Sequence, residues 1–190
     1  MKEEKNILRK RLFELRNSLS AEEVEQRSKC IIEKLRGIDA FQNVQSIFCY
    51  VSFDNEVKTL ELLQACISMG KQVSVPLALV RERRLVPYEV HDLQTELKRG
   101  HWGILEPDKN LCRAIDKRDI KAAVIPGLGF DRQRDRLGYG LGFFDRLLAD
   151  LDPNALKIGL AFDFQVLERL PTEWYDRKMD MIVTEAGIIG

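Results

Sequence analysis

The chain has 190 residues, in which thirty lysines and arginines balance thirty aspartates and glutamates. That length suits one domain, here residues 1–190, and the zero net charge argues against a general nucleic-acid or membrane-binding surface. The expected partner is therefore a small molecule, with no nucleic acid and no membrane.

Two helices are predicted before any strand. The first is indicated by four leucines at helical spacing in a segment rich in Lys and Arg, namely Leu8, Leu12, Leu15 and Leu19. Ser20 and Glu23 form the pattern of a capping box, which starts a second helix that ends at Gly37. The chain therefore opens with an amphipathic helical pair.

A strand–helix–strand unit follows. Residues 46–51 form a short apolar run of the buried-strand type, and residues 72–79 form the next strand. Between them lies a helix that Thr59 caps and that ends at Gly70. Because two buried strands joined by a helix run parallel, we expect a mostly parallel sheet.

The second half of the chain supplies the remaining strands. Residues 84–90 are predicted as an edge strand because Pro87 lacks a ladder donor, and the polar, irregular segment 91–117 is a candidate lid. A helix over residues 142–151 separates the first two of three further strands, at residues 122–127, 156–162 and 181–184. The predicted fold class is α/β, a three-layer open, mostly parallel sheet with helices on both faces, preceded by the two N-terminal helices.

The cysteines and the N-terminus bear on the location of the protein. The cysteines, which show no CxxC spacing and are expected as reduced core residues, are Cys30, Cys49, Cys66 and Cys112. The N-terminus lacks the apolar core of a signal peptide, and no window reaches the roughly 18 uncharged apolar residues of a membrane helix. We therefore expect a cytoplasmic protein.

The segment DRLGYGLGFFDR, residues 135–146, places glycines at every second position. It follows a predicted strand, and ligands of open parallel sheets gather at the carboxyl ends of strands. Bare backbone N–H groups, the start of a helix and Arg136 would suit a phosphate, although the spacing matches neither a Walker loop nor a dinucleotide fingerprint. A phosphate cradle and a plain structural loop both remain open.

Two acidic residues are further candidates for the site. Asp145 lies one turn into the predicted helix, where it would hold Mg²⁺ against a phosphate; the alternatives are a solvated face or a pairing with its neighbour Arg146. Glu56 follows the strand at residues 46–51, where it would contact a polar substrate group, or else be a surface acid. His91 and His101 lie in a polar stretch, so nucleophilic catalysis and zinc find little support.

Residues 126–146, PGLGFDRQRDRLGYGLGFFDR, closely resemble the signature of the 5-formyltetrahydrofolate cyclo-ligase family, in which PGLxFD leads to RLGxGxGYYD. Residues 159–185 resemble the family's C-terminal block. Further matches extend the resemblance over nearly the whole chain: Lys5, Leu8, Arg9, Glu56, Thr59, Gly70, Lys71, Val73 and Pro76.

The resemblance implies an ATP- and Mg²⁺-dependent closure of 5-formyltetrahydrofolate, with or without a polyglutamate tail, to 5,10-methenyltetrahydrofolate. ADP and phosphate are released, and phosphorylation of the formyl oxygen gives an iminium phosphate. Most of the protein's task is then positioning and charge stabilisation. A monomer is expected.

The resemblance also assigns roles to residues. Arg136 is implied as the catalytic residue, which neutralises the charge in transfer, and Asp145 and Asp176 are implied as Mg²⁺ ligands. The implied folate contacts are Tyr50, Glu56, Tyr139 and Phe143. The implied ATP contacts are Lys5, Arg9, Arg136, Leu137, Gly138, Tyr139, Gly140, Leu141, Gly142, Phe143 and Phe144.

Some positions depart from the family pattern: Lys58, Arg134, Leu141, Phe143, Phe144 and Tyr175. The missing phenol hydroxyls of the phenylalanine pair would cost about 1 kcal/mol per lost hydrogen bond. An active enzyme is the favoured interpretation. The alternatives are a diverged protein that holds reduced folate without turnover, and a sugar-phosphate isomerase or transferase on a similar sheet.

Overall fold

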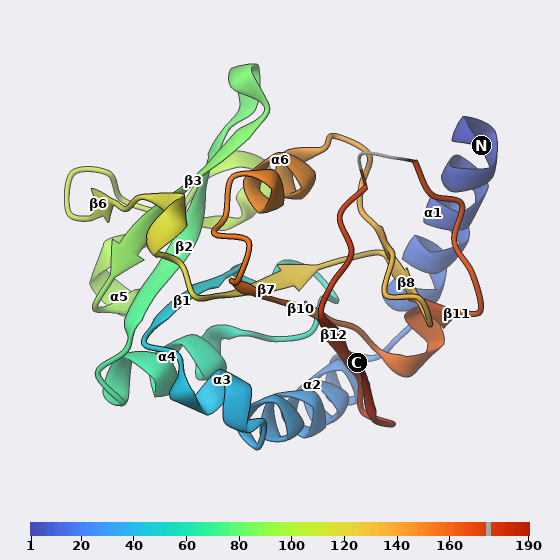
Figure 1. Ribbon diagram of the computed structural model, residues 1–190, viewed down its shortest axis with the longest axis horizontal. Helices are drawn as coiled ribbons and strands as arrows, with labels where there is room; N and C mark the ends of the chain where they lie inside the picture. Colours follow the sequence, from blue (N-terminus) through green and yellow to red (C-terminus); the bar gives the residue numbers. More distant parts are fainter. Residues whose placement is uncertain (174–175) are drawn as a thin grey trace.

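The computed structural model describes residues 1–173 and 176–190, and an eight-stranded sheet forms its centre (Figure 1). Its five middle strands run parallel, and antiparallel strands flank them on both sides. In spatial order the strands are β13 (Ile188–Ile189), β12 (Met181–Val183), β10 (Leu156–Leu160), β7 (Ala122–Pro126), β1 (Ser46–Cys49), β2 (Gln72–Leu79), β3 (Arg84–Val90) and β6 (Arg113–Ala114).

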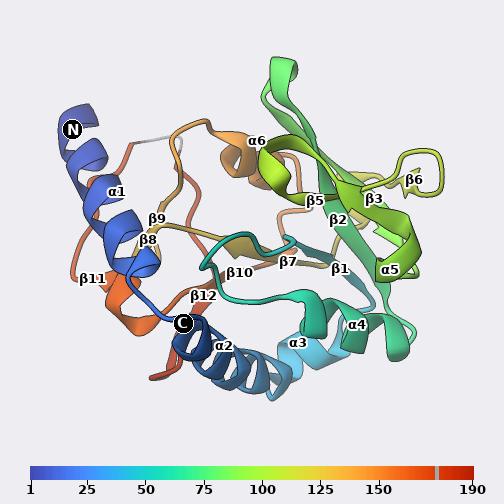
Figure 2. The same ribbon diagram turned by 180° about the vertical axis from the view of Figure 1, so that it is seen from behind.

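Helices cover both faces of this sheet. The helices α2 (Ala21–Arg36), α3 (Asp39–Asn43) and α4 (Leu60–Ser68) lie below it, and α6 (Phe143–Ala149) lies above it (Figures 1 and 2). Every residue of β1 and β7 is buried, because strands covered on both faces have no polar side to expose. The predicted three-layer, mostly parallel α/β fold is therefore confirmed.

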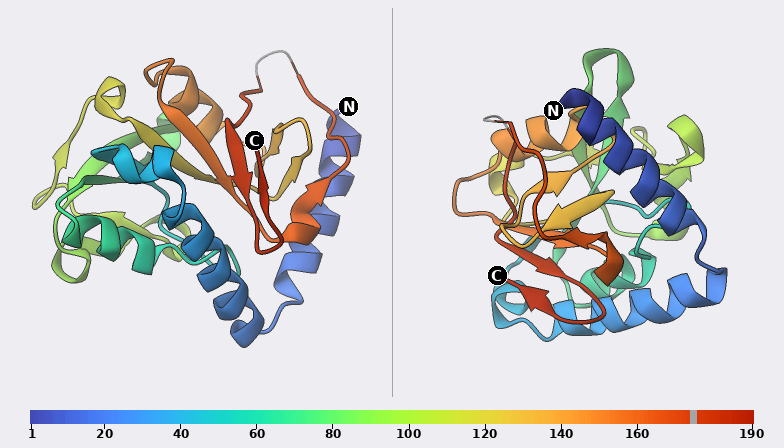
Figure 3. Two further views of the ribbon diagram at one scale, coloured as in Figure 1. Left: turned by 60° about the horizontal axis from the view of Figure 1, so that its bottom comes forward. Right: turned by 90° about the vertical axis from the view of Figure 1, so that its right-hand side faces the viewer.

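The first helix, α1 (Lys2–Asn17), stands at the side of the sheet near the strands β8 (Gly129–Asp131) and β11 (Val166–Leu167) (Figure 3). Leu12 is buried there as predicted, but Leu15 is exposed, and Arg16 is buried in its place. The inner face of α1 thus carries charge as well as leucine, because buried acceptors from other elements meet it.

The two predicted helix caps differ in outcome. The capping box of α2 is confirmed, since the Glu23 N–H donates to Ser20 Oγ at 3.2 Å and the Ser20 N–H donates to Glu23 Oε2 at 2.8 Å. Thr59 does precede α4, but its hydroxyl does not cap the helix. The hydroxyl donates to the Tyr50 carbonyl at 2.8 Å and accepts from the Ser52 N–H at 3.0 Å. It therefore holds the loop that follows β1.

The segment predicted as irregular, residues 91–117, contains secondary structure. It forms α5 (Leu93–Glu96), the strand β6, and a hairpin of β4 (Leu97–Arg99) and β5 (Leu105–Pro107). The buried Glu106 carboxylate ties this hairpin to the sheet by accepting from the Ala78 N–H at 3.2 Å. The strand β3 is nearly an edge strand, because β6 pairs only with its residues Tyr88 and Glu89.

The glycine-containing segment is partly strand and not entirely loop. The strand β8 pairs with β9 (Arg136–Leu137) and with β11 in a small second sheet. Arg134 lies in the turn between β8 and β9 with a left-handed φ of 68°. At such a left-handed φ, glycine is the residue with the least strain. Tyr175, another departure from the pattern, lies outside the described residues.

Most of the cysteines lie in the core. Cys49, Cys66 and Cys112 are buried, Cys30 is half-buried, and all four are free thiols. Among the helices of the described ranges, none is both long and apolar enough to cross a membrane.

Candidate active site

A cavity of about 460 Å³ opens at the carboxyl ends of β1 and β7, where open parallel sheets bind ligands. Its volume lies in the usual range for small-molecule sites. Its walls come from α1, the loop after β1, the β4–β5 hairpin and residues 138–142, which we call the glycine loop. The cavity therefore joins segments that lie far apart in the sequence.

Every predicted site residue lines this one cavity. The set comprises Lys5, Arg9, Tyr50, Glu56, Arg136, Leu137, Gly138, Tyr139, Gly140, Leu141, Gly142, Phe143, Phe144, Asp145 and Asp176. The structure thus brings the predicted residues together, while their individual roles stay predictions.

The glycine loop has the conformation that its sequence suggests at two of its three glycines. Gly140 and Gly142 have φ of 92° and 70°, which favours glycine, whereas Gly138 has no left-handed φ. A Cβ on Gly140 would lie 3.1 Å from the Arg9 guanidinium carbon. Arg9 also donates from Nε to the Gly138 carbonyl at 2.9 Å. The bare backbone of the loop therefore lets a cation from α1 approach closely.

Two ion pairs face the cavity. Lys5 Nζ lies 2.7 Å from Asp176 Oδ2, and Arg136 Nη2 lies 2.7 Å from Asp145 Oδ1. The predicted alternative of Arg146 as the neighbour of Asp145 is wrong, because the buried Arg136 guanidinium is its partner. Asp145 is half-buried, so it lies only partly in solvent. Asp145 and Asp176 thus each have a cation beside them, and a bound anion would compete with these two carboxylates for Arg136 and Lys5.

Arg136 is the most enclosed of these cations, with its side chain 3% exposed. It donates to the Pro126 carbonyl at 3.3 Å, and its guanidinium carbon lies 5.6 Å from the centre of the Phe144 ring. Among the described residues its Nε finds no hydrogen-bond partner, and this atom is buried away from the cavity. A guanidinium held between a carboxylate and a ring on the cavity wall is suited to a second anionic acceptor.

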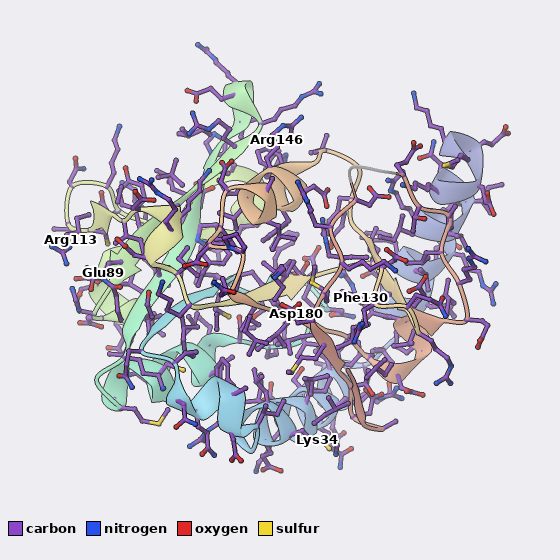
Figure 4. All side chains as sticks on the ribbon, viewed as in Figure 1. Lys34, Glu89, Arg113, Phe130, Arg146 and Asp180 are labelled. Atoms are coloured by element: carbon purple, nitrogen blue, oxygen red, sulfur yellow. The ribbon has the colours of Figure 1, made fainter. Side chains whose placement is uncertain are left out.

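Arg146 fastens the start of α6 instead of pairing with Asp145. Its guanidinium donates to the carbonyls of Leu141 and Gly142, both at 3.0 Å, and to that of Arg83 at 3.2 Å. Figure 4 shows Arg146 between α6 and the tip of the β2–β3 hairpin. This arginine therefore ties the end of the glycine loop to the sheet.

Glu56 is buried, so the alternative of a surface acid is wrong. Its Oε1 accepts from the Tyr139 hydroxyl at 3.1 Å, and its Oε2 accepts from the Phe53 N–H at 3.1 Å. Burial raises the pKa of Glu56 and raises the pKa of Tyr139 to about 12. Tyr50 donates its hydroxyl to the Val57 carbonyl at 2.8 Å, and burial raises its pKa well above the usual value.

Sequence reasoning missed much of the apolar wall and one buried cation. The lining also includes Phe13, Phe53, Trp102, Ile104 and Pro126. Arg16 lies behind the wall, with Nη2 at 2.6 Å from the Tyr139 hydroxyl. Its spacing was a usable signal, because Lys5, Arg9, Leu12 and Arg16 repeat every three or four residues on one helical face.

These features define an α/β protein with a small-molecule cavity at the carboxyl edge of its sheet. Cations and carboxylates meet at the glycine loop, where they suit a phosphate and a metal ion. Aromatic side chains line the rest of the cavity, where they suit a flat ring system.

The comparisons with known proteins agree on one family. The sequence model of the 5-formyltetrahydrofolate cyclo-ligase family matches residues 1–185. The 5-formyltetrahydrofolate cyclo-ligase of Haemophilus influenzae is 28% identical over 177 residues, covering 89% of this chain and 91% of the relative. The mouse enzyme of the same name is 26% identical over 189 residues, covering 95% of this chain and 93% of the relative.

Solved structures extend this likeness to three dimensions. The NMR structure of 5,10-methenyltetrahydrofolate synthetase from Aquifex aeolicus matches with a TM-score of 0.85 and 32% identity, covering 97% of this chain and 91% of that one. The synthetase from Mycoplasma pneumoniae shares the fold, with a TM-score of 0.76, 22% identity, and coverage of 95% and 98%.

The chain belongs to the 5-formyltetrahydrofolate cyclo-ligase family, and it is an enzyme of that family. This membership replaces the two alternatives drawn from the sequence, a folate-binding protein without turnover and a sugar-phosphate isomerase or transferase.

Proposed function

We propose that the enzyme closes 5-formyltetrahydrofolate to 5,10-methenyltetrahydrofolate at the expense of ATP, with release of ADP and phosphate. The observation that carries this proposal is the convergence of a cationic glycine loop and an aromatic wall in one cavity. Together with the family membership, it supports one site in which a phosphate-bearing ligand and a flat ring system meet.

The reaction needs coupling because a formyl amide is a poor electrophile with a poor leaving group. Transfer of the terminal phosphoryl group of ATP to the formyl oxygen gives an iminium phosphate. The neighbouring folate nitrogen then attacks the formyl carbon, loses its proton, and the carbon–oxygen bond breaks with departure of phosphate. The protein contributes position and charge stabilisation.

The nucleotide is assigned to the cationic end of the cavity. Lys5 and Arg9 approach it from α1, and Arg136 approaches from beneath the glycine loop. The place of Arg136 on the cavity wall and its enclosed side chain support its role at the transferred phosphoryl group. The remaining contacts are the backbone and side chains from Leu137 to Phe144.

The chemistry of the donors fits Mg²⁺. In residues 1–173 and 176–190, no group of three or more His, Cys, Asp or Glu side chains is placed to form a metal cage. Protein Mg²⁺ sites often use only one or two carboxylates together with substrate phosphates. Asp145 and Asp176 are two such carboxylates on the same cavity, and we assign them to the metal. Bound Mg²⁺ would offset phosphate charge.

The folate is assigned to the aromatic part of the cavity. Glu56 offers it a buried acceptor, and Phe143 and Tyr139 offer ring surface. Tyr50 contributes ring surface as well, because its hydroxyl already donates to the Val57 carbonyl. A cytoplasmic location and a monomeric state accompany this proposal as predictions.

The direct test is a spectrophotometric assay with purified protein, 5-formyltetrahydrofolate, ATP and Mg²⁺. Formation of the conjugated methenyl product is followed by absorbance, and ADP release is measured in parallel. We expect product and ADP in equal amounts only when all components are present.

Two results would contradict the proposal. Product formation without ATP would show that no phosphoryl transfer is needed. Folate binding with neither product nor ADP would show that the chain does not catalyse this reaction. Omission of Mg²⁺ tests the metal assignment separately, because full activity in a chelator would exclude it.

A further inference from the structure

Arg16 is buried behind the cavity wall and plays no part in the roles assigned so far. Its side chain is 1% exposed, and it does not line the cavity. Nη2 donates to the Tyr139 hydroxyl at 2.6 Å, and Nη1 lies 3.7 Å from Glu56 Oε1. The same Glu56 oxygen accepts from the Tyr139 hydroxyl at 3.1 Å. The three side chains therefore form a closed triangle across three segments of the chain.

The enclosure of Arg16 excludes direct contact between this residue and a ligand. The guanidinium lies between the rings of Phe13 and Tyr139, 5.9 Å and 5.7 Å from their centres. In the described part of the chain its Nε has no hydrogen-bond partner and is buried. An arginine so enclosed acts through the side chains that it contacts, and these are Glu56 and Tyr139, which both line the cavity.

We propose that Arg16 is a positioning residue that keeps the Glu56 carboxylate charged and fixed toward the cavity, and thereby sets the affinity for folate. This inference rests on the proposed function for the identity of the ligand. It assigns to α1 a second task besides the phosphate contacts of Lys5 and Arg9.

The charges around Glu56 support this assignment. Burial raises the pKa of Glu56, and Arg16 is the strongest influence that lowers it. Hydrogen bonds from the Phe53 N–H and the Tyr139 hydroxyl also lower it, and Asp54 on the same loop raises it. Tyr50, from the end of β1, also faces Glu56. No other cation appears among these neighbours in the described part of the chain, so removal of Arg16 leaves a buried carboxylate with an uncompensated charge.

The first experiment follows the carboxylate itself, without any ligand. Protein with ¹³C-labelled glutamate is titrated by NMR, and Glu56→Gln identifies the Glu56 signal. In the wild type we expect the Glu56 carboxyl to be ionised at neutral pH, as the proposal requires. In Arg16→Met the midpoint is expected to rise by roughly one to three pH units, the usual influence of a nearby opposite charge. Arg16→Lys, which keeps a cation, is expected to stay nearer the wild type.

The second experiment measures the KM for 5-formyltetrahydrofolate against pH. Binding that needs the ionised carboxylate is present above the Glu56 pKa and is lost as the pH falls through it. In Arg16→Met this loss is therefore expected at higher pH, with KM about tenfold above wild type between the two titration midpoints and close to wild type in alkaline solution. Arg11→Met, at an exposed arginine of the same helix, is the matched control.

The outcomes separate this inference from the proposed function. A KM raised equally at all pH values would make Arg16 merely structural, and an unmoved Glu56 midpoint would overturn the inference. If Arg16→Met does not fold, the wild-type titration decides, because a Glu56 carboxyl that is protonated at neutral pH also overturns the inference. A wild-type protein without cyclisation activity would refute the proposed function, while the NMR titration would still test the triangle.

Discussion

Single residues at the cavity act through charge that other residues balance. Arg136 pairs with Asp145, Lys5 pairs with Asp176, and Arg16 lies beside Glu56. A charge in a closed site interacts more strongly with its partner than the same charge in water, because less water is present to screen it. Substitutions of these residues should therefore have larger effects than substitutions of surface arginines.

Arg136→Ala should lower kcat/KM by roughly 30- to 1,000-fold, which corresponds to about 2 to 4 kcal/mol of lost transition-state stabilisation. The reason is the loss of a charge-assisted contact to the transferred phosphoryl group. Steady-state kinetics measure the effect, and Arg132→Ala, at an exposed arginine, is the control. Turnover at the wild-type rate in Arg136→Ala would remove Arg136 from the proposed mechanism.

Arg134 affects the free energy of unfolding and not catalysis. Because its φ of 68° is left-handed, Arg134→Gly should be more stable than Arg134→Ala by about 1 kcal/mol. At Arg132, which has no left-handed φ, the order should reverse, with alanine about 0.5 to 1 kcal/mol more stable than glycine. Urea unfolding of the four variants checks this, and the same order at both positions would contradict the left-handed turn.

At the scale of elements, α1 and the glycine loop form the site together. Arg9 donates to the Gly138 carbonyl, and Arg16 donates to the Tyr139 hydroxyl. The side chain of Leu12 packs where a Cβ on Gly129 of β8 would lie. The first helix is therefore one wall of the cavity, and its docking completes the site.

Lys5→Ala should raise the KM for ATP, with a smaller effect on the KM for folate, because Lys5 reaches the cationic end of the cavity from this helix. One charge-assisted hydrogen bond predicts about a tenfold increase or more. Lys10→Ala removes an exposed lysine of the same helix and should leave both values unchanged. An unchanged KM for ATP in Lys5→Ala would argue against phosphate binding by α1.

At the scale of the whole molecule, the cavity joins the N-terminal helix, the middle of the sheet and Asp176 near the C-terminus. A ligand that spans these walls binds only the folded chain. Binding should therefore stabilise the molecule as a unit.

The melting temperature should accordingly rise when nucleotide and Mg²⁺ are added together. At a ligand concentration of 100 Kd the gain is about 2.7 kcal/mol, or roughly 5 to 10 °C for a chain of this size. Differential scanning calorimetry measures the melting temperature with ATP alone, with Mg²⁺ alone and with both together. A shift with ATP that Mg²⁺ does not enlarge would contradict a joint site at Asp145 and Asp176.

The sequence alone determined the α/β class, the parallel centre of the sheet and the capping box of α2. These features depend on neighbouring residues, through apolar runs, helical periodicity and turn residues, and local patterns suffice to reveal them. Its motifs also indicated the family, and every site residue that they predicted lines the cavity.

Only the tertiary structure decided which charges meet. Asp145 pairs with Arg136 instead of Arg146, the Thr59 hydroxyl holds a loop instead of capping α4, and Arg16 is buried in place of Leu15. A charged or polar group is buried only where a partner from elsewhere in the chain compensates the loss of water. The periodicity of the sequence does not reveal that partner, because the fold brings it from a distant element.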